Sequence, residues 1–389
     1  MKLHTKIIKQ VFASKLVTAF GAIVLLLGQP ILAADLKIKI GFVSPLTGPS
    51  GLSGKDAQNG AQMAMEDLNA KGIIIAGKKY QIELITQDDA GDPRQATSTA
   101  QILVDANVNA VVGHLTSGTT IPASKIYNQA GIAQIAAFTT NPQYTQQGYK
   151  TAFRMCPNDN QLGDTLGHYA VDKIGAKKIA VIDDATAYGQ GIANQFVKTV
   201  KGTSNQASIV AREQTNDKAV EFHSILTNIK RFKPDVIFFG GMGTTAAPLL
   251  LQMKSLGIQA KLMGGDGICG PSALPDLLGK NLIDGQVICA DLGGPDSKAV
   301  QAWSTGFAKR FGSQYGNAKY SYDAIFVLIE AMKTAGSIDP KIYLPALAAI
   351  KFQGITGNIQ FDKNGDMVNA PIALYTFVNG KHELISLSH

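Results

Sequence analysis

The sequence predicts an α/β protein built from two doubly wound lobes, each with a mainly parallel sheet between layers of helices. Strand patterns and helix patterns alternate along almost the whole chain from residue 37 onward. Strands that are separated by helices of about 10–15 residues require right-handed crossovers, and such crossovers produce a parallel sheet. Two alternating series of similar size follow one another without a low-complexity linker, which favours two lobes joined by short crossover segments.

The first series begins with a strand at Lys37–Ser44 and a helix at Lys55–Ala70. Small and apolar residues share one face of this helix, at Ala57, Ala61, Ala64, Met65 and Leu68. Asp92 and Pro93 predict the start of a second helix, because both an N-cap carboxylate and a proline in the first turn favour a helix start. The other expected elements are strands at Tyr80–Gln87, Val108–Gly113, Ile132–Ala137 and Lys150–Met155, and a helix from Thr119 to Gln129.

The second series repeats this alternation over the next hundred or so residues. The expected helices are Asn158–Ile174, Gly189–Val200, Ala219–Arg231 and Thr244–Leu256, and the expected strands are Lys177–Asp183, Ser208–Glu213, Asp235–Gly240 and Lys261–Gly264. We therefore expect a second parallel sheet of the same kind.

The first 34 residues have the pattern of a secretory signal peptide. Four lysines precede the apolar run Leu16–Leu27, and small residues lead to a cleavage site near Ala34. The alternative is a membrane anchor, but an apolar run of about a dozen residues is too short to span a ~30 Å hydrocarbon core. The segment contains no cysteine that could carry a lipid. We expect an exported protein that diffuses freely in a bacterial periplasm.

Length and charge are those of an ordinary two-domain protein. Removal of the signal peptide leaves about 355 residues, which is enough for two domains. The net charge of +7 falls to about +3 without the four N-terminal lysines. The pI of 9.1 therefore does not indicate a nucleic-acid partner.

Three cysteines lie in the mature chain, at positions 156, 269 and 289. In an oxidising compartment an odd number favours one disulfide and one free thiol. Cys269 and Cys289 are close in sequence and each follows a short β-rich run, so we predict that they pair and that Cys156 is free.

Polar and glycine-rich loops follow several predicted strands, which is where open α/β sheets bind their ligands. Residues 114–120 and 138–142 combine hydroxyl side chains with backbone N–H groups at a helix start, an arrangement that suits a carboxylate. N-capping alone is the alternative explanation for such a loop. In the second series Asp266 lies among glycines after a strand, where it is either the partner of a ligand ammonium or a turn residue.

Catalytic and metal-binding motifs are not found. The segment Gly48–Asp56 resembles a phosphate-binding loop, but it has one residue too many between Gly48 and Gly54, and Asp56 stands where Mg²⁺ needs Ser or Thr. The sequence has no Gly-x-Ser-x-Gly elbow and no Cys-x-x-Cys, and its six histidines lack metal-ligand spacing. We expect no enzymatic activity, no cofactor and no metal site.

Six short motifs are spread along the chain. They are Pro45-Leu46-Thr47-Gly48-Pro49, Asp88-Asp89-Ala90-Gly91-Asp92-Pro93, Gly113-His114-Leu115, Pro122-Ala123-Ser124, Tyr188-Gly189-Gln190-Gly191 and Phe361-Asp362-Lys363-Asn364-Gly365-Asp366. Together they resemble the type I periplasmic binding proteins of ABC importers, in the branch that binds leucine, isoleucine and valine. The resemblance extends over residues 37–380.

The resemblance implies two Rossmann-like lobes joined by a three-segment hinge, with crossovers near residues 156, 290 and 369. Lobe one would comprise residues 35–155 and 291–368, and lobe two residues 157–289 and 370–389.

It also implies a ligand site between the lobes, in which lobe one holds the head group of an amino acid first and lobe two adds contacts on closure. The corresponding residues are Leu115, Thr116, Ser117, Phe138, Thr139 and Thr140 in lobe one, Tyr188, Met242 and Asp266 in lobe two, and Ser53 and Tyr322 as further pocket-lining positions.

Four positions depart from the pattern of close leucine binders. Gly91 and Thr116 stand where a disulfide-forming pair of cysteines is often found. Met242 replaces a common ligand-facing tyrosine, and Phe138 replaces a small residue. These differences leave the fold unaffected but weaken the case for leucine itself.

We therefore expect the binding protein of an ABC importer, a monomer that closes on an aliphatic amino acid and delivers it to permease subunits in the inner membrane. One alternative is the same fold binding an amide, urea or an aromatic acid, and another is an exported sensor subunit that reports to a receptor. The sequence does not fix the ligand, because one methylene in an apolar pocket changes affinity by only ~1–3 kcal/mol.

Overall fold

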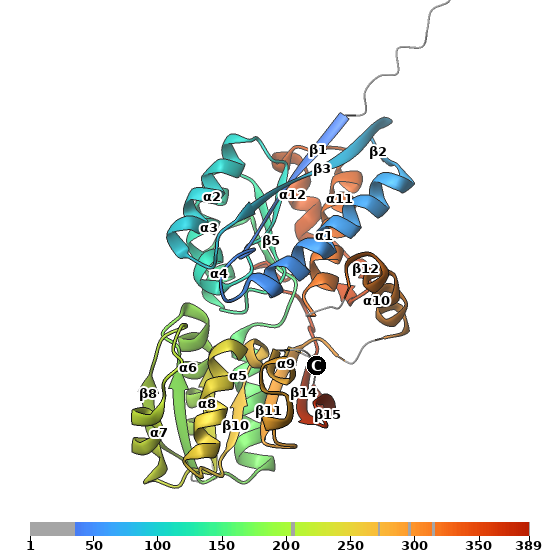
Figure 1. Ribbon diagram of the computed structural model, residues 1–389. Helices are drawn as coiled ribbons and strands as arrows, with labels where there is room; N and C mark the ends of the chain where they lie inside the picture. The colour runs from blue at the N-terminus through green and yellow to red at the C-terminus, as the bar shows by residue number, and fades with distance from the viewer. Residues whose placement is uncertain (1–35, 204–206, 271–272, 295–296, 313–315, 389) are drawn as a thin grey trace, which may run out of the picture. The chain divides into compact units, whose positions relative to one another are not determined.

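The structure is a computed structural model that describes residues 36–203, 207–270, 273–294, 297–312 and 316–388. The expected signal peptide lies outside these described residues. The helices and strands after it form two α/β lobes, each built around its own sheet (Figure 1). Within the described ranges, no helix combines the length and the apolar character that crossing a membrane requires.

The sheet of the first lobe has six strands in the order β2-β3-β1-β4-β5-β6, and all are parallel except β2, which runs antiparallel to β3. The strands are β1 (Leu36–Ser44), β2 (Ile73–Ile75), β3 (Lys78–Asp88), β4 (Ala110–Gly113), β5 (Ala133–Ala136) and β6 (Ala152–Arg154). In β4, Val112 belongs to the apolar core on one face of the sheet and Val111 to the core on the other. A sheet buried on both faces is what parallel pairing predicts.

Helices cover both faces of this sheet. Those on one face are α1 (Gly51–Lys71), α10 (Lys298–Phe311), α11 (Ala318–Ala335) and α12 (Pro340–Ala348), and those on the other are α2 (Pro93–Asp105) and α3 (Ser117–Ala130), with the short α4 (Gln143–Gln146) following β5 (Figure 1). The small face of α1 lets α11 approach closely. A Cβ at Gly60 would lie only 2.0 Å from the carbonyl oxygen of Ala318, so only glycine fits there.

The sheet of the second lobe has seven strands in the order β15-β14-β11-β10-β9-β7-β8. They are β7 (Lys178–Asp183), β8 (Ser208–Gln214), β9 (Val236–Gly240), β10 (Lys261–Gly264), β11 (Val287–Leu292), β14 (Ile372–Val378) and β15 (Lys381–Ser388), and only β14 and β15 run antiparallel to their neighbours. In β7, Val181 and Ile182 again face different cores. A separate hairpin is formed by β12 (Phe352–Gly354) and β13 (Gly357–Ile359).

The helices of the second lobe are α5 (Asp159–His168), which continues into a π-helical turn at Tyr169–Lys173, α6 (Ala187–Gly202), α7 (His223–Lys230), α8 (Gly243–Ser255) and α9 (Ala273–Leu278). The helix expected at Ala219–Arg231 is shorter than predicted. The backbone N–H of Phe222 donates to the Oε1 atom of Gln252 at 2.6 Å, and this tertiary contact holds Phe222 at a non-helical φ of −129°.

The chain crosses between the two sheets three times, after β6, after β11 and before β14. Near the crossing expected around residue 290, Asp291 and Leu292 pair with Ala373 and Ile372, so β11 belongs to the second sheet up to its last residue.

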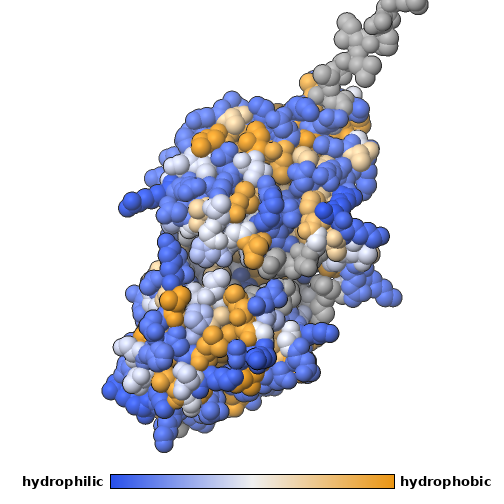
Figure 2. Space-filling model, in the orientation of Figure 1, coloured by the Kyte–Doolittle hydropathy of each residue, from blue (hydrophilic) through white to orange (hydrophobic). Residues whose placement is uncertain are grey.

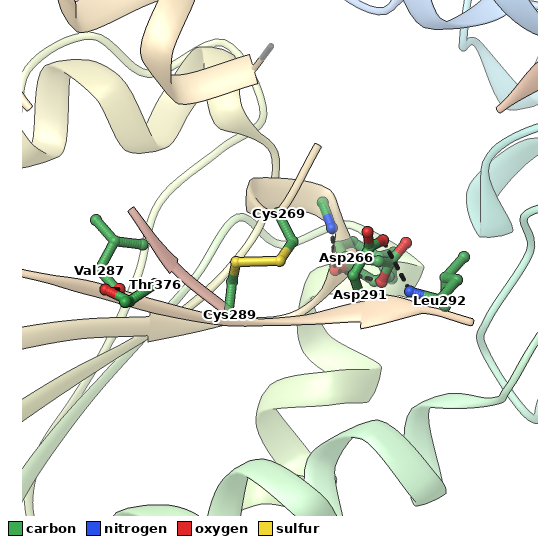
Figure 3. The surroundings of a disulfide bond; sticks show 9 residues. Asp266, Cys269, Val287, Cys289, Asp291, Leu292 and Thr376 are labelled. Atoms are coloured by element: carbon green, nitrogen blue, oxygen red, sulfur yellow. Dashed lines mark hydrogen bonds between the residues drawn. A yellow bond between two sulfur atoms is a disulfide. The ribbon is translucent and has the colours of Figure 1, made fainter. Parts of the chain in front are cut away.

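The predicted disulfide is confirmed. Cys269 and Cys289 are bonded, with their Cα atoms 5.3 Å apart, and the bond ties β11 to the loop after β10 (Figure 3). Cys156 is a free, buried thiol, as expected, and burial raises its pKa.

The surface is mostly hydrophilic on the face shown in Figure 2, as the amino-acid composition leads us to expect. On the face shown in Figure 2 hydrophilic residues predominate, and apolar residues form separate patches among them. Large exposed apolar side chains such as Leu52 and Val220 lie far apart in sequence. Scattered residues of this kind are normal for a folded protein in water.

Candidate functional site

Helix starts and strand ends of both lobes line one cavity of about 510 Å³. Its walls are Pro49, Ser50, Ala90, Gly91, Asp92, Pro93, Thr116 and Gly118 from the first lobe, and Asp184, Ala185, Thr186, Ala187, Tyr188, Asn216, Asp217, Lys218, Met242 and Thr244 from the second. The first group lies at the starts of α1, α2 and α3, and the second follows β7, β8 and β9. This is the edge at which open α/β sheets bind ligands.

The first-lobe wall is formed by the start of α3. Thr116 is the N-cap residue of this helix, with an extended backbone and its hydroxyl 2.9 Å from that of Thr119. Ser117 begins the helix and its Oγ accepts a 3.3 Å hydrogen bond from the N–H of Asn141. The first N–H groups of a helix have no intrahelical acceptor, so α3 offers them to an anion in the cavity.

The loop after β5 lies beside the start of α3 and is held by a buried arginine. The Arg154 guanidinium donates to the carbonyl oxygens of Thr139 and Asn141 at 2.7 and 2.9 Å. Thr140 is buried, and its side chain hydrogen-bonds the carboxyl group of Asp159.

The second-lobe wall contains a tyrosine that is hydrogen-bonded on both sides. The Tyr188 hydroxyl donates to Oδ1 of Asp266 and accepts from the N–H of Gly267, both at 2.9 Å. Local structure places Tyr188 here, because Thr186 caps α6 by accepting a 3.0 Å hydrogen bond from the N–H of Gly189. Asp266 lies at the start of a 3-10 turn next to Asp291 (Figure 3).

Two carboxyl groups near Tyr188 have strongly raised pKa values. Burial raises the pKa of Asp266 to about 7, while the charge of Asp291 adds to the shift and the Tyr188 hydroxyl opposes it. Burial also raises the pKa of Asp159 to about 8, and the negative charge of Asp266 raises it further. A hydrogen bond with Thr140 and the charge of Arg154 lower the pKa of Asp159 but do not offset its burial.

The structure brings most of the expected site residues to this region. Thr116, Tyr188 and Met242 line the cavity, and Asp266 is bonded to Tyr188. Leu115, Ser117, Phe138, Thr139 and Thr140 belong to the two adjoining loops after β4 and β5. Phe138 is edge-to-face with Tyr320 of α11, their ring centroids 5.1 Å apart.

Tyr322 and Ser53 lie in neither the cavity lining nor the two adjoining loops. The Tyr322 hydroxyl donates to Asp67 at 3.0 Å and its ring packs in the core of the first lobe against Trp303. Tyr320 is the tyrosine of α11 that packs against Phe138, because positions two apart on a helix face about 200° away from one another. Ser53 is the third residue of α1, and the cavity is lined instead by Ser50.

Asp159 is a site residue that the sequence did not single out. It begins α5, its side chain is fully buried, and its pKa is affected by Asp266. In the sequence it looks like an ordinary acidic residue in the first turn of a capped helix. Only its burial, which depends on tertiary packing, distinguishes it.

One cluster of side chains that could ligate a metal is found within the described residues, and it consists of Cys269, Cys289 and His382. Its two sulfur atoms are bonded to each other, so neither is a thiolate ligand.

The two lobes and the cavity at their strand ends define a type I periplasmic binding protein fold. The branched-chain amino acid transporter substrate-binding protein LivJ of Streptococcus pneumoniae, solved in complex with isoleucine, matches with a TM-score of 0.80 and 28% identity, over 90% of this chain and 99% of that chain.

The family described as periplasmic binding protein matches residues 37–382, and the chain belongs to that family. The Leu/Ile/Val-binding protein homolog 1 of Brucella abortus is 33% identical over 351 residues, which are 89% of this chain and 91% of that protein. The leucine-, isoleucine-, valine-, threonine- and alanine-binding protein of Pseudomonas aeruginosa is 31% identical over 376 residues, 96% of this chain and 97% of that protein. These findings confirm the resemblance seen in the motifs.

Proposed function

We propose that this protein is the periplasmic binding component of an ABC importer and that it binds an aliphatic, branched-chain amino acid between its lobes. The observation that carries the proposal is the pairing of opposite chemistries at the cavity. Thr116 and Gly118 at the start of α3 line the cavity on the first lobe, and Tyr188, whose hydroxyl donates to Asp266, lines it on the second. A zwitterion needs both, since each charge that leaves water needs compensation.

The roles follow from this chemistry. Ser117, Thr140 and the N–H groups at the start of α3 hold the ligand carboxylate, and Asp266 holds the ammonium. Thr116, Met242 and Phe138, with Leu115 and Thr139, bound the space for the aliphatic side chain. The names of the Brucella and Pseudomonas relatives support an aliphatic amino acid as the ligand.

Closure of the lobes provides the mechanism. We assign residues 35–155 with 293–368 to lobe one, and residues 157–292 with 370–389 to lobe two, with hinge segments at the three crossings. Asn141 of the first lobe donates a 2.6 Å hydrogen bond to the carbonyl oxygen of Ala187 in the second, a contact that closure can make and opening break. A ligand that touches both lobes shifts the population toward the closed form.

The protein acts in the periplasm after cleavage near Ala34, as a monomer that performs no reaction of its own. Its closed form is what the permease subunits in the inner membrane recognise. The family and the named relatives support this assignment.

Mass spectrometry of the small molecules released from gently purified, denatured protein tests the ligand class directly. Calorimetry with a panel of leucine, isoleucine, valine, alanine and threonine then ranks affinities. We expect an aliphatic amino acid in both measurements. Release and tight binding of an amide, urea or benzoate instead would replace the amino-acid assignment, and binding to a receptor without transport would favour a sensor subunit.

A further inference from the structure

We propose that the base of the second lobe, the end opposite the cavity, is a docking surface for a membrane that carries anionic lipid headgroups. We call this end the basal surface and define it by six exposed side chains, those of Lys178, Lys230, Arg231, Lys233, Lys254 and Lys261. A protein docked in this way keeps its cavity accessible, so docking and ligand binding do not compete.

The six residues lie together because parallel strands start at the same edge of a sheet. Strands β7, β9 and β10 are neighbours. At their starts the N–H of Asp235 donates to the carbonyl oxygen of Lys178 at 2.8 Å, and the N–H of Lys261 donates to that of Asp235 at 3.0 Å. The other four members lie at the end of α7, in the loop after it and in the last turn of α8, just before β9 and β10 begin.

The basal surface is strongly positive. It holds six basic side chains against the one acidic side chain of Asp235, an excess that is larger than the net charge of about +3 of the mature chain. On its flanks Asp172 and Asp284 are accompanied by Lys173 and Lys280. Among the described residues none of the six side chains forms an ion pair with a carboxylate.

Helix stability explains only part of this pattern. A lysine near a helix C-terminus interacts favourably with the helix dipole, as Lys230 and Lys254 do at the ends of α7 and α8. Lys178, Lys233 and Lys261 lie outside helices, so the dipole gives no reason for their charge. Like charges that gather on one surface repel each other, and an anionic partner removes this repulsion.

Apolar side chains among these charges favour a lipid surface over a soluble polyanion. Ile283 is 44% exposed in the loop before β11, and Gly285 of the same loop accepts a hydrogen bond from Nζ of Lys261. The Arg231 guanidinium lies over the half-buried ring of Phe232, 4.7 Å from its centroid. Lysines attract anionic headgroups, and an exposed apolar side chain gains from burial at the lipid interface.

The cavity lies at the opposite ends of the same strands, since its second-lobe wall follows β7, β8 and β9. A strand of six residues such as β7 spans roughly 20 Å, so a membrane at the basal surface does not cover the cavity. The inference rests on the proposed periplasmic location, which brings the basal surface within reach of membrane lipids.

Co-sedimentation of the mature protein with lipid vesicles tests the proposal. Phosphatidylcholine vesicles with about 30% phosphatidylglycerol should bind the protein at about 0.1 M salt and release it at about 1 M, because the screening length falls from ~10 Å to ~3 Å. Vesicles of phosphatidylcholine alone should not bind it. Binding to both kinds of vesicle alike, or to neither, would overturn the inference.

The triple variant Arg231→Gln, Lys233→Gln, Lys254→Gln should bind the anionic vesicles about 100-fold more weakly, since each basic residue near an anionic surface contributes about fivefold. Glutamine removes the charge and keeps a long, helix-compatible side chain.

The matched control is Lys309→Gln, Lys341→Gln, Lys351→Gln, which removes the same charge from exposed positions of the first lobe and should bind vesicles like the parent. Equal losses in the two triple variants would show that net charge alone attracts the vesicles. Binding to soluble polyphosphate as tight as binding to vesicles would replace lipid as the partner. Either result overturns the inference.

Calorimetry with L-leucine keeps the two proposals apart. The parent and both triple variants should bind it equally, with and without vesicles, which also shows that the variants are folded. Leucine binding that vesicles abolish would contradict the docked orientation. If the parent binds no amino acid, the amino-acid assignment fails, and the vesicle measurements alone sustain or overturn the docking surface.

Discussion

At the scale of single residues, Arg154 and Asp159 show two different fates of a buried charge. The Arg154 side chain is 0% exposed, and its guanidinium is bonded to two loop carbonyls, to Thr145 and to Asp366. Asp159 is as deeply buried, but its hydrogen bond with Thr140 and the charge of Arg154 do not offset its burial, so its pKa stays raised. Full pairing indicates that Arg154 stabilises the loop after β5.

Asp266→Asn should weaken amino-acid binding by about 2–5 kcal/mol. The amide keeps the shape of the side chain but leaves the ligand ammonium without its opposite charge in a dry site. Ser117→Ala should cost less, about 1–3 kcal/mol, because backbone donors of α3 remain. Calorimetry against the strongest ligand of the panel measures both. An Asp266→Asn protein with parental affinity would mean that the ligand cation lies elsewhere or that the ligand has none.

Arg154→Met should lower the free energy of unfolding by about 3–5 kcal/mol, because the Asp366 carboxylate then lies beside an apolar side chain without its positive partner. The matched control is Arg310→Met, which removes an arginine that is 42% exposed and pairs with Glu66 and Asp67 on the surface. Exposed pairs of this kind contribute less than about 1 kcal/mol. Urea unfolding of both variants makes the comparison, and equal losses would show that burial of Arg154 adds nothing.

At the scale of elements, β11 connects the parallel and antiparallel parts of the second sheet. It pairs in parallel with β10 and antiparallel with β14, and its last residues lead into the second hinge crossing. The disulfide fixes this strand to the 3-10 turn that carries Asp266 (Figure 3). Strand β11 therefore connects the turn that carries Asp266 with the second crossing between the lobes.

The double variant Cys269→Ala, Cys289→Ala should be destabilised by about 3 kcal/mol, because a cross-link over a separation of 20 residues restricts the unfolded chain. Cys156→Ala serves as the control that leaves the disulfide intact. Thiol titration in denaturant without reductant should find one reactive thiol in the parent. Three thiols in that titration, or equal stability of the double variant and the parent, would contradict the structural role of the bond.

At the scale of the whole molecule, two sheets with separate cores meet through loops and hinge segments, and the cavity lies where they meet. The core of the second lobe also includes Ala137 and Tyr320 of the first, so the lobes share apolar contacts beside the cavity.

A saturating amino acid should reduce the radius of gyration of the protein in small-angle scattering. The contacts that the ligand makes with both lobes favour the closed form over the open one. The Asp266→Asn variant at the same ligand concentration should compact less. A profile that does not change with a tightly bound ligand would exclude closure as the mechanism.

The empty protein should become less stable as the pH rises from about 4 to about 8. The pKa of Asp159 is raised from 3.8 to about 8 and that of Asp266 to about 7, so the folded state keeps protons that the unfolded state loses. By linkage, unfolding free energy falls by at most about 1.4 kcal/mol per pH unit for each group. Urea unfolding across this window measures the slope, which should flatten in Asp159→Asn. Stability that rises with pH would rule out the raised values.

The α/β class, the two sheets, several loops that line the cavity and the disulfide can be predicted from the sequence alone. These predictions rest on local or compositional features, which can be recognised without knowing the fold. The features are strand and helix periodicity, capping signals such as Asp92 and Pro93, and the odd number of cysteines. Motif positions also pointed to Thr116, Tyr188 and Met242, which line the cavity, and to Asp266, which accepts a hydrogen bond from Tyr188.

Which of several similar residues lie near the cavity depends on how the chain packs. The phase of helix α11 places Tyr322 in the core and Tyr320 beside Phe138. A contact with Gln252 shortens α7, and β11 pairs with β14 up to Leu292. In the sequence Asp159 looks like an exposed capping acid, because its burial arises only when separate parts of the chain pack together.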